Sequence, residues 1–390
     1  MKKLFFVSIL LMTVAAGAIA QEPKDRLNPT LSGVPSLTIT PDARAGGMGD
    51  VGAATNPDIN SQYWNPAKYV FMESPAGFTF SFTPWLSKLV KDINLSYAAG
   101  YWKFDELQSV SASLRYFSLG AINLYNASGA DMGVQAHPNE LAFDLAYSRL
   151  LSEKWSAAVA FRYIRSDMNN GVNSGPDVMY PGNSIAGDVA TYYRTPIDVS
   201  TGEANLAFGL NISNIGSKIS YDENQTSIFI PTNLRLGTSF EFPFDDYNKI
   251  SINADINKLL IPSSQLQREG ETAEEFAIRR EEHMNMGPLA GIFKSFGDAP
   301  GGASEELREI MWSTGVEYAY NNQFFIRGGY FHEHATKGNR KFFTAGVGFK
   351  LNMFQLDAAY LISAAQSNPL DQTLRFSLGF DLNGLQNLMK

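Results

Sequence analysis

Hydrophobic and polar residues alternate with a period of two along much of this chain. Leu234, Leu236, Phe240 and Phe242 fall on every second position, and polar or small residues stand between them. The same alternation recurs at 205–212, 250–257 and 373–380. Because successive side chains of a β-strand point to opposite faces, each segment has one apolar and one polar face.

About fourteen segments of this kind can be counted. They are roughly 77–85, 93–104, 108–119, 139–150, 155–167, 188–195, 203–214, 232–243, 247–259, 311–320, 323–332, 340–352, 354–363 and 372–382. Most of them run about nine to thirteen residues, the length that a tilted strand needs to cross the hydrocarbon of a membrane. Strands of soluble proteins are usually shorter.

The connections between these segments alternate in length. Those after the second, fourth and eighth segments are tight, whereas those after the third, fifth, seventh and ninth are long. Short periplasmic turns and long extracellular loops are typical of outer-membrane barrels. The sequence therefore predicts an all-β fold, a transmembrane antiparallel β-barrel over residues 77–382. Aromatic residues near strand ends, such as Tyr101, Trp102 and Trp155, suit either a membrane-interface girdle or cross-strand packing in a sandwich.

The first twenty residues have the features of a secretory signal peptide. Lys2 and Lys3 precede the apolar run 4–14, and Ala18-Ile19-Ala20 places small residues before an expected mature start at Gln21. The apolar run is too short for a transmembrane helix, which needs about 20 residues. The alternative is a buried N-terminal core helix.

Composition excludes several kinds of chemistry. The chain has no cysteine, which excludes disulfides, thiolate metal sites and cysteine nucleophiles. Removal of Lys2 and Lys3 from the 31 basic residues leaves 29 against 39 acidic residues, a balance of −10. Binding to nucleic acid requires a basic face, so we expect no nucleic-acid partner.

Ten charged residues fall on the polar faces of the segments. They are Arg115, Arg162, Arg235, Arg327, Arg375, Asp144, Glu241, Asp255, Glu317 and Asp357. An arginine facing lipid near the midplane would cost several kcal/mol. We therefore expect these arginines to face the lumen and to pair with the acids there, either in a plugged interior or in the lining of a conducting pore.

A motif precedes the first strand. Gly47-Met48-Gly49 is followed by Asp50 and later by Asn65-Pro66-Ala67. The motif resembles the N-terminal hatch of the FadL-like outer-membrane proteins, and the chain as a whole resembles their PorV (LptO) family of the Bacteroidetes type IX secretion system. FadL-like barrels have fourteen strands, in agreement with the count above, and an N-terminal hatch. Outside the predicted strands we therefore expect a periplasmic segment and hatch over 21–76 and a tail at 383–390.

The resemblance also implies a function. Members of that family are carriers that bind secreted cargo through its folded C-terminal signal domain. They take it from the translocon barrel (SprA/Sov) to the surface attachment complex, which contains PorU, PorQ and PorZ, next to lipopolysaccharide and the lipid bilayer. The alternatives are a FadL-type transporter of long-chain fatty acids or other hydrophobic molecules, and a lipopolysaccharide deacylase.

The long ninth loop, 260–310, is the segment most suggestive of function. Thr272 and Glu275 form a capping box that opens a helix extending to about Met284. A second helix is expected from Pro288, with an apolar stripe of Leu289, Ile292, Phe293 and Phe296. A third helix is expected near Ser304. The stripe either packs on the barrel mouth or forms a docking surface for a protein or an apolar ligand.

Three further patterns favour no catalytic site. Gly47-x-Gly49-x-x-Gly52 matches a dinucleotide fingerprint but lacks the helix that must follow it. His332-Glu333-His334 has no specified third ligand for a metal. No Gly-x-Ser-x-Gly of a hydrolase occurs. We expect no enzymatic activity, no cofactor and no metal.

Overall fold

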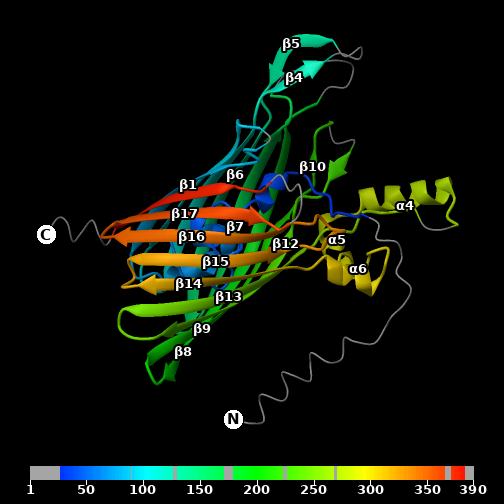
Figure 1. The fold of residues 1–390 in the computed structure, drawn as a ribbon. Helices are drawn as coiled ribbons and strands as arrows, with labels where there is room; N and C mark the ends of the chain where they lie inside the picture. The colour runs from blue at the N-terminus through cyan, green and yellow to red at the C-terminus, as the bar shows by residue number, and fades with distance from the viewer. Residues whose placement is uncertain are drawn as a thin grey trace.

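A computed structural model of the chain shows a closed antiparallel β-barrel of 14 strands (Figure 1). The structure describes residues 27–88, 90–125, 130–170, 179–222, 226–267, 270–364 and 370–382. Strands that follow one another in the barrel are hydrogen-bonded neighbours, and β1 closes the ring by pairing with β18 from Gly77↔Asp381 to Phe82↔Phe376. Closure satisfies the backbone of every strand, as a lipid environment requires. The barrel predicted from alternation is confirmed.

The strand bounds follow the predicted segments closely. The barrel strands are β1 (Ala76–Pro84), β2 (Ile93–Lys103), β3 (Gln108–Leu119), β6 (Asn139–Ser152), β7 (Trp155–Asp167), β8 (Gly182–Val199), β9 (Gly202–Gly216), β12 (Asn233–Pro243), β13 (Asn248–Leu259), β14 (Met311–Tyr320), β15 (Phe324–His332), β16 (Lys341–Leu351), β17 (Phe354–Ser363) and β18 (Leu374–Asp381).

The sixth predicted strand, 188–195, is wrong in length, because β8 has 18 residues. It continues at both ends by pairing with β9, from Ala186↔Gly216 to Val199↔Gly202, so the ladder overrides the weak strand propensity of its glycine and proline. Two short loop hairpins were not predicted. These are β4 (Ile122–Tyr125) with β5 (Asp131–Ala136), and β10 (Ile219–Ser220) with β11 (Ser227–Ile228).

Side chains alternate between lipid and lumen as the pattern predicts. In β1 the phenylalanines Phe78 and Phe80 are 48% and 44% exposed on the outside, whereas Thr79 and Ser81 face inward and are buried. β2 departs from the rule, because its inward side chains are the apolar or aromatic Leu95, Tyr97 and Tyr101. For Tyr101 neither of the two interpretations holds, a membrane-interface girdle or cross-strand packing in a sandwich, because its ring stacks on Tyr69 inside the barrel at 4.7 Å between centroids.

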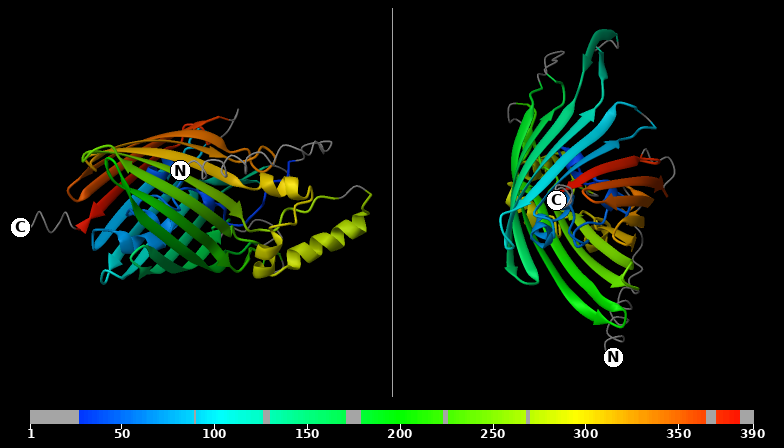
Figure 2. Two further views of the ribbon diagram at one scale, coloured as in Figure 1. Left: turned by 90° about the horizontal axis from the view of Figure 1, so that it is seen from below. Right: turned by 90° about the vertical axis from the view of Figure 1, so that its left-hand side faces the viewer.

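Residues 27–75, which we call the plug, fill the barrel from within (Figure 2). The plug contains the short helices η1 (Pro35–Thr38), α2 (Ala43–Gly46), α3 (Ser61–Trp64) and η2 (Pro66–Phe71). Its start lies at the end of the barrel that carries the long loops, where the Asn28 amide N–H donates to the carbonyl of Thr336 at 2.8 Å. The expected periplasmic position of 21–76 is therefore wrong for the first described residues.

The long loop carries three helices, α4 (Ala273–Asn285), α5 (Pro288–Lys294) and α6 (Ala303–Arg308), which project from the same end (Figure 1). None of the helices in the described parts of the chain is long and apolar enough to cross a membrane. The expected signal peptide, 1–20, and the expected tail, 383–390, lie outside the described residues.

Candidate functional site

The motif Gly47-Met48-Gly49 holds the plug against one wall of the barrel. A Cβ added at Gly329 of β15 would lie 2.1 Å from the Met48 carbonyl carbon, and one at Gly315 of β14 would lie 2.4 Å from the Met48 carbonyl oxygen. Gly49 itself has φ +72, and its N–H donates to Thr344 Oγ1 at 2.8 Å. Glycines on both sides thus allow backbone to lie directly on backbone.

Asn65-Pro66-Ala67 fixes the opposite side of the plug. The Asn65 side chain accepts from the Ala67 N–H at 3.1 Å and donates to the carbonyls of Ala53 and Thr191 at 3.0 and 2.9 Å. The carbonyls of Pro66 and Ala67 accept from Ser148 and Ser156 at 2.8 and 2.6 Å. The motif therefore caps η2 and ties it to β6, β7 and β8, and its role in the structure is anchorage.

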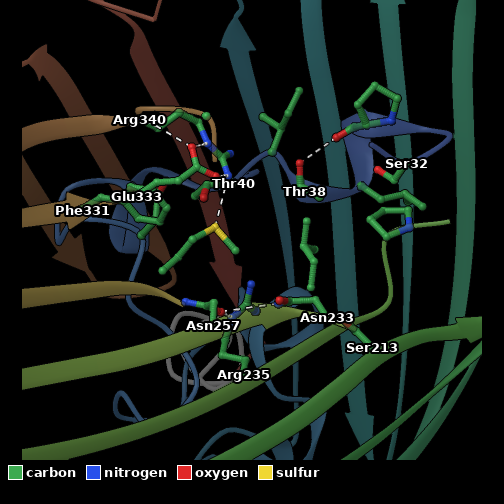
Figure 3. A pocket seen from close by; sticks show the side chains of 18 of the residues that line it. Ser32, Thr38, Thr40, Ser213, Asn233, Arg235, Asn257, Phe331, Glu333 and Arg340 are labelled. Carbon is green, nitrogen blue, oxygen red and sulfur yellow. Dashed lines mark hydrogen bonds and ion pairs between the residues drawn. The ribbon is translucent and has the colours of Figure 1, made fainter. Parts of the chain in front are cut away.

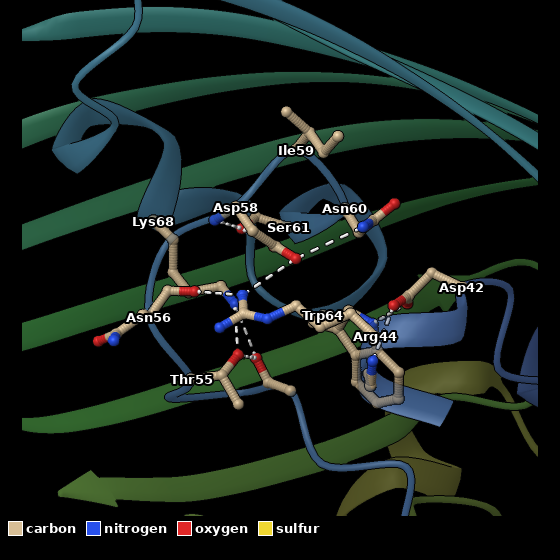
Figure 4. A network of polar contacts seen from close by, with 12 residues as sticks. Asp42, Arg44, Thr55, Asn56, Asp58, Ile59, Asn60, Ser61, Trp64 and Lys68 are labelled. Atoms are coloured by element: carbon tan, nitrogen blue, oxygen red, sulfur yellow. Dashed lines mark hydrogen bonds and ion pairs between the residues drawn. The ribbon is translucent and has the colours of Figure 1, made fainter. Parts of the chain in front are cut away.

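A chain of buried ion pairs links the plug to the barrel wall, and Figure 4 shows its plug end, where Arg44 lies beside Asp58. Arg44 pairs with Asp58 at 3.1 Å within the plug and with Glu317 of β14 at 2.9 Å. Glu317 also accepts from Arg327 at 2.6 Å, and Arg327 reaches Asp357 at 2.6 Å. Breaking a buried pair of this kind is strongly destabilising, so the chain locks the plug in place.

The expected pairing of lumen arginines with lumen acids is only partly right. Arg162 pairs with Asp144 and Asp188, and Arg327 pairs with Glu317 and Asp357. Arg375 instead pairs with Asp50 of the plug at 2.9 Å.

Two of the predicted acids also bind the plug and not an arginine. Asp255 accepts from the N–H groups of Gly52 and Ala53, and Glu241 accepts from Asn56. Arg115 and Arg235 form no ion pair with a described residue. Groups of the plug therefore bind several of the charged side chains that were expected to pair with one another across the lumen.

Sequence reasoning missed the charged residues of the plug. Asp42 accepts from the Trp64 indole N–H at 2.6 Å, and Lys68 donates to the Gly52 carbonyl and to Thr55 Oγ1. All four of Asp42, Arg44, Asp58 and Lys68 lie in a segment rich in glycine and alanine. These charges could have indicated binding to the barrel wall, because every charged side chain of a segment buried inside a barrel needs a partner.

Lysines at the mouth of the barrel hold the long loop down. Lys258 pairs with Glu309 at 2.6 Å, and Lys337 pairs with Glu305 at 2.6 Å and with Glu309 at 3.0 Å. Burial raises the pKa of Glu309, but hydrogen bonds from Lys258, Ser263 and Lys337 outweigh it and hold that pKa below its usual range. The end of α6 is therefore fixed to the barrel by a buried cluster of charges.

The apolar stripe of α5 faces away from the barrel. Leu289, Phe293 and Phe296 are 64%, 78% and 55% exposed, and Ile292 is half-buried. The opposite face is the packed one, because a Cβ at Gly291 would lie 2.8 Å from Phe229.

Of the two interpretations of the stripe, packing on the barrel mouth is therefore wrong. One detail also differs from the sequence prediction, since α5 ends at Lys294 and Phe296 follows in a turn. The three exposed side chains form a surface that we call the α5 patch, consisting of Leu289, Phe293 and Phe296.

The histidines of strand β15 and the loop after it serve packing. His332 stacks on Trp312 at 5.1 Å between centroids, Glu333 pairs with Arg340 at 2.9 Å, and His334 Nδ1 contacts Thr336 Oγ1. Within the described ranges no group of three or more His, Cys, Asp or Glu side chains could hold a metal ion.

Comparison with known proteins places the chain in a family. Residues 21–266 match the family described as type IX secretion system protein PorV. No curated protein gives a significant match.

Several solved structures are similar to this chain, one of them with a TM-score above 0.5. A "TodX deltaS2S3 mutant monoaromatic hydrocarbon channel" has a TM-score of 0.51 at 10% identity, covering 87% of this chain and 96% of that one. The Pseudomonas putida toluene transporter TodX has a TM-score of 0.49 at 10% identity, with 91% and 98% covered. A Pseudomonas aeruginosa FadL homologue has a TM-score of 0.44 at 10% identity, with 88% and 99% covered. Identities this low indicate the fold alone. The chain belongs to the PorV family of the type IX secretion system and is an outer-membrane β-barrel with a FadL-like fold.

Proposed function

We propose that this barrel is a carrier of the type IX secretion system. It binds the folded C-terminal signal domain of secreted cargo at its extracellular loops. It then takes the cargo from the translocon barrel to the surface attachment complex, where the PorU, PorQ and PorZ proteins act. In this proposal the chain itself is not an enzyme, and no cofactor or metal takes part.

The observation that carries the proposal is the α5 patch. Three large apolar side chains stand exposed on a loop that α6 and its buried charge cluster fix to the barrel. Exposed apolar surface that is held in one place is typical of a protein-binding site. A fixed site also loses less conformational entropy on binding than a flexible loop would.

The locked plug supports a carrier over a pore. Glu317 and Asp255 bind the plug from the barrel wall, and Met48 lies directly on barrel glycines. Passage through the lumen would require these buried contacts to break, at several kcal/mol for the ion pairs alone. The loops, in contrast, are available without any rearrangement.

The second candidate is a FadL-type transporter of long-chain fatty acids or other hydrophobic molecules. A cavity of about 480 Å³ at the loop-bearing end of the lumen (Figure 3) favours it. The two candidates differ in what accompanies the protein when it is purified.

Affinity capture of the full chain from detergent-solubilised membranes separates them. We expect cargo signal domains to be captured with the wild type. Phe293→Ser removes a side chain that is 78% exposed, which on binding is worth about 1–2 kcal/mol, or roughly tenfold in affinity. Leu107→Ser is the matched control, because Leu107 is 49% exposed in the turn at the opposite end of the barrel. Capture of lipids alone, or equal loss of cargo in both variants, would contradict the carrier proposal.

A further inference from the structure

A groove runs along the lipid-facing wall of the barrel over β2 and β3. Its volume is about 550 Å³, which is in the range of small-molecule sites. Tyr101, Ser111 and Ser113 border it, but their side chains point into the lumen and are buried. The side chains that project toward the lipid from the border of the groove are apolar. The groove therefore suits hydrocarbon.

The groove exists because neighbouring lipid-facing positions carry small residues. Phe78, Gly100, Ala112 and Leu145 are successive ladder partners in one row across β1, β2, β3 and β6. The outer two are large and are 48% and 52% exposed, whereas Gly100 and Ala112 between them, with Ala98 next to Gly100 on the same face, form a low floor. A chain that fills such a depression gains dispersion contacts on three sides, which a flat wall does not offer.

The groove lies in the half of the membrane next to the periplasm. Trp102 and Val110, which are ladder partners, form one end of it, and the tight turn 104–107 follows directly. Short turns of such barrels face the periplasm, and tryptophan at a strand end marks the membrane interface. Ala98 is four residues from Trp102, about 13 Å along the strand. One leaflet has about 15 Å of hydrocarbon, so the groove starts at the interface and ends within the same leaflet.

An exposed cation stands at the interfacial end of the groove. Arg149 projects from the lipid-facing side of β6, two residues beyond the ladder partner of Val110. It forms no ion pair with a described residue. The acids of the adjacent turn have other partners, since Asp105 accepts from a backbone N–H of the turn and Glu106 pairs with Lys103. The guanidinium of Arg149 is therefore available to an anion at the membrane surface.

We propose that the groove and Arg149 form a binding site for one phospholipid of the periplasmic leaflet. One acyl chain lies over Ala98, Gly100 and Ala112, and Arg149 binds the phosphate of the headgroup. The distribution of charge favours this occupant, because an apolar groove within the leaflet leads to a single cation at its surface. The site is separate from the α5 patch, which lies at the other end of the barrel, so it does not depend on the carrier function.

Native mass spectrometry of the full chain, released from a non-ionic detergent, tests the site. The probes are palmitoyl-oleoyl phosphatidylethanolamine and palmitoyl-oleoyl glycerol, which has the same two chains and no phosphate. We expect one phosphatidylethanolamine to bind about tenfold more tightly than the glycerol lipid. Arg149→Gln should abolish this preference. Ala98→Leu fills the floor of the groove and should weaken the binding of both probes about tenfold.

Two matched controls leave the groove and its cation intact. Ala345→Leu enlarges an exposed small residue on the lipid-facing side of β16, and Arg165→Gln removes an exposed lipid-facing cation at the loop-bearing end of β7. Both should bind the phospholipid within threefold of the wild type, and heat-modifiable migration in gels checks that every variant is a folded barrel. Equal binding of the two probes, or unchanged binding in either Arg149→Gln or Ala98→Leu, would overturn the site. A benzoylphenylalanine at position 98 that crosslinks in cells to a protein and not to lipid would overturn it as well.

Discussion

Replacing Glu317 by glutamine tests the claim that buried ion pairs lock the plug. The side chains of Glu317, Arg44 and Arg327 are 5%, 9% and 1% exposed, so the variant leaves two buried guanidiniums without their shared acid. Removing one partner of a buried pair typically costs about 3–5 kcal/mol. Arg44 keeps Asp58 and Arg327 keeps Asp357, so we expect a loss near the lower limit, about 3 kcal/mol.

The assay is urea unfolding in detergent micelles, followed by tryptophan fluorescence and extrapolated to zero denaturant. Lys350→Gln is the matched control, because Lys350 is 39% exposed and pairs with Asp381 at 3.4 Å. An exposed pair is worth about 0–1 kcal/mol. If Glu317→Gln loses no more free energy of unfolding than Lys350→Gln, the plug is not held by this chain of charges.

Two further predictions concern the plug and the long loop. Gly329→Ala places a Cβ 2.1 Å from the Met48 carbonyl carbon and should lower the free energy of unfolding by about 1–3 kcal/mol in the same urea assay. Gly328→Ala is the control and should not lower it, because its Cβ meets only a carbonyl oxygen at 3.9 Å. Equal stability of the two variants would contradict the close contact between the plug and the barrel wall. The pKa of Glu309 is lowered from 4.5 in the folded protein. The ionised carboxylate therefore stabilises the loop fully above pH 4.5, and this stabilisation is lost as the pH falls through the lowered pKa of the folded protein. A spin label on Ala303→Cys, unique because the chain has no cysteine, should become more mobile below pH 4.5, and constant mobility down to pH 2 would refute this role of Glu309.

The barrel could be predicted from the sequence because its signal is local. Phe78 and Phe80 differ from Thr79 and Ser81 by one position each, and that step sends a side chain to the other face. β2 shows the limit of such reasoning. Its apolar inward face exists because Tyr101 meets Tyr69 of the plug, and no pattern within the strand reveals that neighbour.

The partners of the lumen charges could not be predicted for the same reason. Arg44 and Glu317 are 273 positions apart, and Arg375 and Asp50 are 325 positions apart. Periodicity assigns each side chain to the lumen but does not say which residues the plug brings there. Among the described residues Arg115 and Arg235 form no ion pair, and the sequence alone does not reveal this either.

The α5 patch was predicted in composition but not in orientation. The spacing of Leu289, Phe293 and Phe296 gives one apolar side and does not say whether that side is covered. Gly291 decides it, because only the small face of α5 can lie against Phe229.

Site-specific photo-crosslinking in cells that secrete cargo is the sharpest test of whether the α5 patch binds cargo. A benzoylphenylalanine incorporated in place of Phe293 lies at the centre of the α5 patch, and one in place of Leu107 lies at the opposite end of the barrel. We expect position 293 to crosslink to the C-terminal signal domain of cargo and position 107 not to. Crosslinks from position 293 to lipid alone, with cargo still attached normally to the cell surface, would contradict it.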